Sequence, residues 1–326
     1  MHGRLGSGAP APSPECAGEP GPSWHELTRV RLKAELYASD VYFREGWAAL
    51  GERFGGQVAE LARALALLLV KPDGLVSGKT GTILDFAAEH GFVATAFATP
   101  KLNGDRWREL WRYQLNAATL DRLAVNDLIM PGGTLLLLLR DERGSNLPAS
   151  VRFQSLKGPS AIAAQPPDCL RKRLGQVTRT LSFVHCADEP VDVIRELAIL
   201  LRGGDRDLVF PKLARSSLPQ SERPELAKFA QRAPTDPFDR AKALQSLRGS
   251  LERSRLYRPD MNWLLEQVEA MEQGETINWR AFHRTLDECG IRVARWTLAS
   301  VASHHIVTDE PGVAKLIPPL DHRLWL

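Results

Sequence analysis

Residues 66–74 read ALLLVKPDG, an apolar run stopped abruptly by a charged turn. A short, continuous apolar run bounded by turn residues is typical of a strand that is buried on both faces. Lys71 follows this strand directly, and its ammonium group is suited to holding a phosphate. Pro72 and Gly74 form a turn that lets backbone amides approach the same group. The stretch therefore predicts a buried strand with an anion-binding residue at its end.

From this strand onward, strands and helices alternate along the chain. The apolar patterns predict strands over 66–70, 92–98, 135–139 and 180–185, and helices over 82–90, 105–115, 117–130 and 190–201. Between the third and fourth strands we expect a long irregular stretch, because it contains Pro148, Gly158, Pro159, Pro166 and Pro167. This order predicts an α+β fold, namely a ferredoxin-like βαββαβ antiparallel sheet of four strands with helices.

The composition changes along the chain and predicts four regions. Residues 1–23 are rich in Gly, Pro, Ser and Ala, and we expect a disordered tail. Residues 24–65 have loose helical spacing and predict an N-terminal helical extension, and residues 66–204 contain the predicted sheet. Residues 205–326 predict a C-terminal all-helical domain, with helices over 222–232, 238–256, 259–273 and 278–289.

Two further residues point to chemistry at the end of the sheet. His185 ends the expected fourth strand, and a neutral imidazole can act as a nucleophile toward phosphorus. Glu196 lies on the helix that follows, where its carboxylate could orient the ring by a hydrogen bond. The alternative for His185 alone is a core histidine bonded to a backbone carbonyl. Together with Lys71, the two residues favour a phosphate-handling site.

These residues together resemble the nucleoside diphosphate kinase family over residues 66–202. The first strand of that family ends in K-P-D-G, which is seen here at 71–74, and its next helix ends in Gly-Phe, seen at 91–92. The catalytic histidine of the family stands in N-x-x-H-G-S-D, and residues 182–188 read SFVHCAD here. The glutamate of the family follows eleven positions later, on Glu196. The resemblance implies His185, Lys71 and Glu196 as the catalytic residues.

The resemblance also implies a set of nucleotide-binding residues. A nucleotide-contacting tyrosine maps to Tyr113, with Trp111 as the competing position. An arginine maps to Arg152, although its spacing to the Gly158-Pro159-Ser160 phosphate loop is two residues longer than the family has. The implied set is Lys71, Tyr113, Arg152, Ser160, Arg171 and Ser182.

The sequence departs from the family at three places. Cys186-Ala187 replaces the Gly-Ser after the histidine, and Ser182 replaces the asparagine. No phenylalanine stands at 120–122, where the family places the aromatic residue that stacks on the base. These departures affect base and sugar recognition more than they affect the histidine chemistry.

The expected activity is phosphotransfer from a nucleoside triphosphate to a nucleoside diphosphate or a related acceptor, through a phosphohistidine on His185. The resemblance implies ATP or another nucleoside triphosphate with Mg²⁺, and we expect phosphates and waters rather than protein ligands to hold the metal. His283 and His304-His305 have no partner ligand at suitable spacing. Two alternatives are the same chemistry on a dedicated specialised-metabolite acceptor, and a catalytically weak nucleotide-sensing or interaction module.

Charge and hydropathy restrict the expected partners. Lys and Arg number 42 against 39 Asp and Glu, a net charge of +3, so neither nucleic acid nor an anionic membrane is expected as a partner. The longest apolar run, 135–139, is far shorter than the roughly 20 residues of a membrane span. No signal-peptide pattern opens the sequence, and we expect a cytoplasmic protein. The resemblance implies nucleoside tri- and diphosphates as partners and a homo-oligomer.

Overall fold

A four-stranded antiparallel sheet forms the centre of the molecule. The structure, a computed structural model, describes residues 22–254 and 259–326, so the expectation of a disordered tail falls on residues outside the description apart from 22 and 23. The strands are β1 (Leu65–Val70), β2 (Phe92–Ala98), β3 (Leu135–Asp141) and β4 (Val184–Cys186). Their order is β2-β3-β1-β4, and every neighbouring pair is antiparallel. The predicted four-stranded antiparallel sheet is confirmed.

The strand β1 lies inside the sheet and is buried along its whole length. It pairs with β3 on one side and β4 on the other, which places Val70 opposite Leu135 and Leu69 opposite His185. A strand covered on both faces needs apolar residues at every position, which explains the unbroken run in the sequence.

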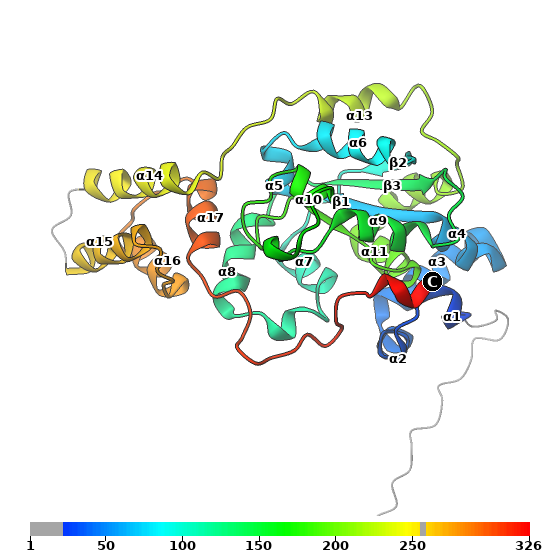
Figure 1. The fold of residues 1–326 in the computed structure, drawn as a ribbon, viewed down its shortest axis with the longest axis horizontal. Coiled ribbons are helices and arrows are strands. Elements are labelled where there is room, and N and C mark those ends of the chain that lie inside the picture. The colour runs from blue at the N-terminus through cyan, green and yellow to red at the C-terminus, as the bar shows by residue number, and fades with distance from the viewer. Residues whose placement is uncertain (1–21, 255–258) are drawn as a thin grey trace, which may run out of the picture.

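Helices cover both faces of the sheet. In the view of Figure 1, α6 (Thr80–Glu89) and α13 (Arg223–Ala230) lie above it, and α11 (Pro190–Leu200) and α3 (Val41–Phe54) lie below it. All residues of α11 are buried, and α3 packs closely along it. Gly46 permits this close approach, because a Cβ there would stand 2.6 Å from the carbonyl oxygen of Ile194.

The remaining elements surround this core. The N-terminal helices are α1 (Trp24–Leu27), α2 (Arg31–Ser39) and α4 (Val58–Ala64). The helices inserted between and after the strands are α5 (Pro72–Val76), α7 (Gly104–Leu110), α8 (Leu120–Ile129), α9 (Ala149–Lys157), α10 (Leu170–Arg173) and α12 (Gly204–Val209). Short 3₁₀ turns are η1 (Gly55–Gln57), η2 (Leu115–Ala117), η3 (Ile162–Ala164), η4 (Phe210–Lys212) and η5 (His322–Trp325).

Two elements differ from the sequence-based expectation. The stretch expected to be irregular contains α9, which supplies the second crossover helix of the βαββαβ order. The expected strand over 180–185 is only Val184–Cys186, because the chain turns sharply at Phe183. Phe183 has a φ of 62°, and the Val184 N–H donates to the Ser182 carbonyl 2.7 Å away, as in a γ-turn.

The C-terminal region is helical as expected, but it does not stay helical to its end. The helices α14 (Arg240–Arg253), α15 (Pro259–Glu272), α16 (Trp279–Glu288) and α17 (Arg295–His304) gather at one end of the molecule, with α17 against α8 (Figure 1). The segment 205–233 instead packs on β2 and on α6, and the Leu218 N–H donates to the Ala94 carbonyl oxygen over 2.7 Å.

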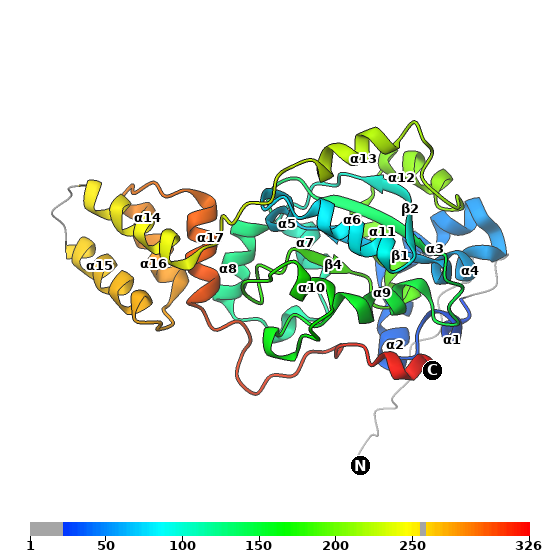
Figure 2. The same ribbon diagram turned by 45° about the horizontal axis from the view of Figure 1, so that its top comes forward.

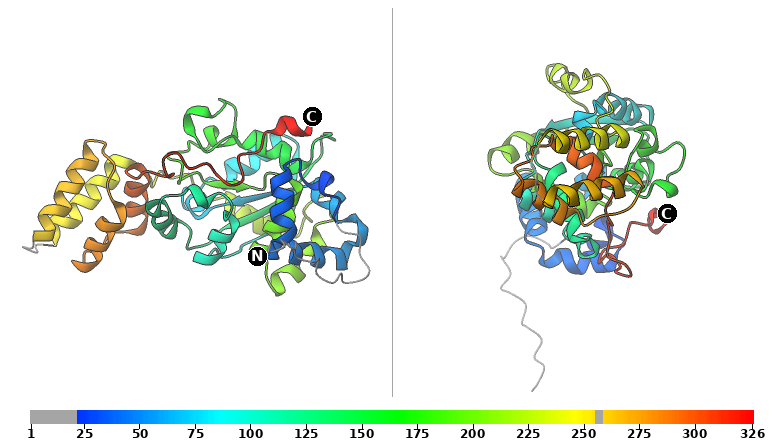
Figure 3. Two further views of the ribbon diagram at one scale, coloured as in Figure 1. Left: turned by 90° about the horizontal axis from the view of Figure 1, so that it is seen from below. Right: turned by 90° about the vertical axis from the view of Figure 1, so that its left-hand side faces the viewer.

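After α17 the chain runs back across the molecule in an extended course, which we call the C-terminal segment (residues 306–326). Figure 2 shows it passing below α8 and α10 and ending near α1 and α2, and the left panel of Figure 3 shows its extended course to the C-terminus. Its last turn is fixed by Trp325, whose indole N–H donates to Glu189 Oε1 over 2.9 Å. Among the described helices, none is both long and apolar enough to cross a membrane.

Candidate active site

His185 lies in the middle of β4, at the edge of the sheet. Its Nε2 stands 2.9 Å from each carboxylate oxygen of Glu196. The glutamate is presented by α11, which folds back under the sheet and contacts β1. The expected pairing of the imidazole with the carboxylate is present in the structure.

The second ring nitrogen of His185 faces Trp111, which follows α7. The indole Nε1 lies 3.1 Å from Nδ1, and the two rings meet edge to face at 87°. An indole N–H can only donate, so Nδ1 must carry a lone pair. The single proton of a neutral imidazole then lies on Nε2 and is donated to Glu196. The two partners of the ring therefore fix its tautomer.

The surroundings of Glu196 disfavour the negatively charged form of its carboxyl group. Burial raises the pKa of this carboxyl, and its interactions with His185 offset only part of that effect. The nearby carboxylates of Asp192 and Asp188 raise the pKa further. Glu196 therefore gains from any positive charge that develops on the imidazole.

The K-P-D-G turn holds the backbone that leads into β4. The Lys71 N–H donates to the Phe183 carbonyl oxygen over 2.8 Å, and Asp73 Oδ2 accepts the Phe183 N–H over 2.9 Å. Gly74 packs against the same carbonyl, since a Cβ there would lie 2.6 Å from the oxygen. The turn thus fixes the strained Phe183 from three directions, two residues before His185.

Two buried cations lie close to this turn. Lys71 Nζ donates to the Thr180 carbonyl oxygen over 2.9 Å and lies 3.3 Å from Asp73 Oδ2. Arg171 donates to the carbonyl oxygens of Gly158 and Val184, over 2.9 and 3.2 Å. Its Nε has no hydrogen-bond partner within the described residues.

Burial affects both of these cations in the same direction. It lowers the pKa of Lys71, although Asp73 counteracts it, and it lowers the pKa of Arg171 to about 10. Burial therefore leaves positive charge on these two side chains poorly solvated. A bound anion would relieve that cost.

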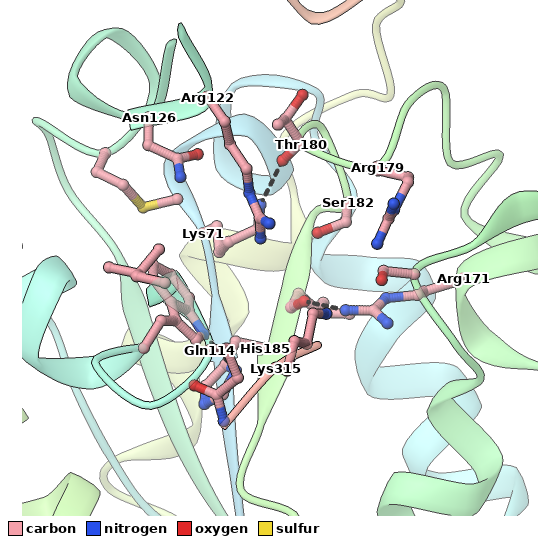
Figure 4. Close-up of a pocket in the computed structure, with 15 residues that line it drawn as sticks. Lys71, Gln114, Arg122, Asn126, Arg171, Arg179, Thr180, Ser182, His185 and Lys315 are labelled. Atoms are coloured by element: carbon pink, nitrogen blue, oxygen red, sulfur yellow. Dashed lines mark hydrogen bonds between the residues drawn. The ribbon is translucent and has the colours of Figure 1, made fainter. Parts of the chain in front are cut away.

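A pocket of about 150 Å³ opens between these groups and His185 (Figure 4). Five cationic side chains line it, from the turn after β1, α8, α10, the 174–183 loop and the C-terminal segment, and its lining includes no carboxylate among the described residues. The lining residues are Lys71, Trp111, Gln114, Leu115, Arg122, Asn126, Met130, Ser160, Arg171, Arg179, Thr180, Ser182, Val184, His185 and Lys315.

A second, wider pocket of about 490 Å³ adjoins the first, and His185 lines both. The 158–166 loop and the end of α9 form one wall, and residues 317–320 of the C-terminal segment form another. Asp188 and Lys157, 3.7 Å apart, also line it. The histidine therefore stands between a strongly cationic chamber and a more mixed one.

The structure brings most of the predicted site residues together. Lys71, Ser160, Arg171, Ser182 and His185 all line the cationic pocket. Glu196 does not line this pocket, but its carboxylate contacts Nε2 of His185, which does.

Two predicted residues are not brought to either pocket. Tyr113 points away, and its hydroxyl donates to Asp40 Oδ2 over 2.8 Å, so the competing position Trp111 stands beside His185 instead. Arg152 pairs with Asp141 over 2.7 Å and donates to the His90 carbonyl oxygen. Arg152 lies six residues before Gly158, which corresponds to roughly 9 Å along the helix axis. Its guanidinium contacts Asp141 and His90 instead of the phosphate loop.

Three cations of the pocket were not predicted. Arg122 stands at the position where the family resemblance called for an aromatic residue, so that comparison could have drawn attention to it. Arg179 and Lys315 lie in stretches without a regular pattern, and the sequence holds no local signal for them.

The pocket offers few ligands for a metal ion. Within the described residues no group of three or more His, Cys, Asp and Glu side chains could hold one. The cationic lining suits Mg²⁺ only as an ion that arrives with a polyphosphate, because Mg²⁺ keeps most of its waters and binds through one or two carboxylates and phosphates.

Comparisons with known proteins give partial likenesses. No protein-family model matches the chain. The Thioredoxin domain-containing protein 3 homolog of Heliocidaris crassispina is 27% identical over 154 residues, which are 46% of this chain. The matched stretch spans only 18% of the length of that relative.

Solved structures that resemble part of the chain are nucleoside diphosphate kinases. Those of Aquifex aeolicus, Encephalitozoon cuniculi and Pyrobaculum aerophilum are 20%, 14% and 17% identical. The matches cover 43%, 45% and 44% of this chain and 96%, 95% and 97% of those chains, with TM-scores of 0.35, 0.38 and 0.35.

Proposed function

We propose that this chain is a phosphotransferase that moves the γ-phosphate of a nucleoside triphosphate to a nucleoside diphosphate through a phosphohistidine on His185. One observation carries the proposal. Glu196 accepts a hydrogen bond from the Nε2–H of His185, and the Nδ1 lone pair, which faces the Trp111 indole, lies beside a pocket lined by five cations. A fixed nucleophile next to concentrated positive charge is the arrangement that phosphoryl transfer requires.

The reaction would proceed in two balanced steps. The Nδ1 lone pair attacks the γ-phosphorus, the bond to the bridging oxygen breaks, and the diphosphate leaves with that electron pair. The Nε2 proton stays in place, so the phosphorylated ring becomes cationic and its charge is stabilised by Glu196. An oxygen of the acceptor diphosphate then attacks the phosphorus, and the N–P electron pair returns to Nδ1.

The residues of the pocket would supply the electrostatic part of catalysis. Lys71 and Arg171 are desolvated and close to His185, and they would neutralise the charge on the transferred phosphoryl group. Trp111 has to give up its hydrogen bond to Nδ1 before attack, because the two compete for one lone pair. Mg²⁺ bound to the triphosphate would neutralise further charge when present.

A second candidate function is a nucleotide-binding module with little turnover. The contact between the Trp111 indole and Nδ1 favours it, because this contact occupies the electron pair that would attack phosphorus. In that case the cationic pocket binds the nucleotide, and His185 stabilises the wall of the pocket through its contacts with Glu196 and Trp111.

Labelling with γ-labelled ATP tests the proposal. The wild-type chain is expected to carry label that is lost in acid and kept in alkali, and His185→Ala is expected to carry none. His283→Ala is the matched control, because His283 lies on α16 and lines neither of the two pockets at His185. A folded wild-type chain that binds ATP without becoming labelled would contradict phosphotransfer and support the binding module.

A further inference from the structure

The C-terminal segment forms part of the wall of the cationic pocket. It runs along η2 and the start of α8, where the Thr119 side chain donates to the Val307 carbonyl oxygen over 2.6 Å. The Glu310 N–H donates to the Ala117 carbonyl oxygen over 2.7 Å, and the Ile317 N–H to that of Tyr113 over 3.2 Å. These bonds keep the segment beside the pocket over about ten residues.

An aspartate of this segment ties two walls of the pocket together. Asp309 accepts from Arg122 of α8, and its other oxygen lies 2.9 Å from Arg179 of the 174–183 loop. One carboxylate thus holds two guanidinium groups from separate elements, and both of them line the pocket. One negative charge faces two positive charges, so Asp309, Arg122 and Arg179 together carry a net positive charge.

The side chain of Lys315 enters the same space. The Asn116 amide holds the backbone on both sides of it, since it donates to the Ala314 carbonyl oxygen and accepts the Leu316 N–H, each over 2.9 Å. Lys315 lines both pockets together with His185 (Figure 4). Within the described part of the chain it has no hydrogen bond or ion pair.

The charges around Lys315 explain why this arrangement calls for an anion. Burial lowers the pKa of Lys315, and the positive charges of Arg122 and Arg179 lower it further, with Asp309 acting in the opposite direction. Three cations gathered around one carboxylate repel one another at short range. A polyanion between them would remove the repulsion and supply Lys315 with a partner.

We propose that Lys315 binds the phosphate groups of the ligand in this pocket, which makes the C-terminal segment a built-in part of the substrate site. Arg122, Arg179 and Lys315 form an outer phosphate subsite, and Lys71 and Arg171 form the inner one next to His185. The inference rests on the proposed function for its choice of ligand, a nucleoside polyphosphate.

Calorimetric binding of ADP and of inorganic tripolyphosphate tests this assignment on the full chain. Lys315→Ala is expected to weaken the binding of both probes by on the order of tenfold, as the loss of one charged hydrogen bond does. Lys315→Arg should keep most of the affinity. Lys172→Ala is the matched control, because Lys172 is exposed on α10 and lines neither of the two pockets at His185.

A second variant checks the positioning of the lysine. Asn116→Ala is expected to weaken the binding of both probes by a smaller factor, because it frees the backbone around Lys315 and leaves the charge of the lysine in place.

Affinities of Lys315→Ala equal to those of the wild type would overturn the assignment, as would a wild-type chain that binds neither probe. A loss confined to ADP would also overturn it, since the lysine would then contact the nucleoside. Binding is measured without phosphotransfer, so an unlabelled His185 would refute the proposed function and leave this result standing.

Discussion

At the scale of single residues, the two nitrogens of His185 have different partners and therefore different tasks. Nε2 is bound to the carboxylate of Glu196, and Nδ1 faces the indole of Trp111 and the pocket. The first contact orients the ring, and the proposed phosphotransfer would place positive charge next to this carboxylate. The second contact occupies the lone pair that, in the proposed reaction, attacks phosphorus once the indole has moved away.

Replacement of Glu196 by glutamine should separate stability from activity. Burial raises the pKa of this carboxyl above its unfolded value of 4.5, so the folded state binds the proton more tightly than the unfolded state does. The stability that this group contributes is therefore fully present below pH 4.5 and is lost as the pH rises through the folded pKa. At pH 7, Glu196→Gln should have a higher melting temperature than the wild type.

The same variant should label more slowly at His185, by roughly 10- to 100-fold, because an amide cannot stabilise the cationic phosphorylated ring as a carboxylate does. Thermal unfolding at pH 7 and pH 4.5 provides the check, and the difference in melting temperature between the two proteins should shrink at the lower pH. A variant that is less stable than the wild type at pH 7 would contradict the charged, buried state of Glu196.

At the scale of elements, the turn after β1 determines where β4 begins. The backbone of Lys71 and the side chain of Asp73 both bind Phe183, and this residue takes up a φ of 62° that L-amino acids rarely adopt. The K-P-D-G motif thus holds the backbone two residues before His185, while its lysine side chain lines the same pocket as the histidine.

Gly74→Ala should disturb this connection. The added Cβ would lie 2.6 Å from the Phe183 carbonyl oxygen and 3.0 Å from Val70 Cγ1, so the turn and the strand must move apart. Overpacking of this kind typically costs about 1–3 kcal/mol. We expect that loss in the free energy of unfolding, measured with denaturant, together with slower labelling of His185.

Gly56→Ala is the matched control for this substitution. A Cβ at that position meets no heavy atom within 4 Å, so its effect on the free energy of unfolding should stay within about 0.5 kcal/mol. Equal stabilities of the two variants would show that the close packing of Gly74 against Phe183 is not required.

The sequence predicted those elements whose pattern is local and strong. The apolar runs of β1 and β3 and the helix α11 were expected close to their observed ends. The helix α9 escaped prediction because its sequence, ASVRFQSLK, has no clear apolar stripe and lies between Pro148 and Gly158. The short β4 could not be predicted, because the turn at Phe183 depends on contacts with residues more than a hundred positions away.

At the scale of the whole molecule, the pocket combines parts that are distant in the chain. Lys71, His185 and Glu196 could be found from the sequence because the K-P-D-G motif, the stretch at 182–188 and the eleven-residue spacing to Glu196 resemble a known family. Lys315 could not, because the C-terminal segment has no periodic pattern and reaches the pocket only through its course across the fold. The roles of these residues in catalysis and binding remain predictions.

The far end of the C-terminal segment shows how this course is maintained. The guanidinium groups of Arg29 and Arg63 lie 4.7 and 5.4 Å from the ring centroid of Trp325, whose indole N–H donates to Glu189. Glu189 also accepts from Thr28 over 2.7 Å and caps α11, the helix that carries Glu196. The N-terminal helices, the C-terminal segment and the helix beneath His185 thus meet in one cluster.

The most direct measurement of the central claim is the identity of the phosphorylated nitrogen. Phosphorus and proton NMR of the chain after reaction with ATP distinguishes a phosphate on Nδ1 of His185 from one on Nε2. Because Nε2 keeps its proton in the hydrogen bond to Glu196, we predict the Nδ1 isomer. A phosphate on Nε2, or on a residue other than His185, would contradict the account.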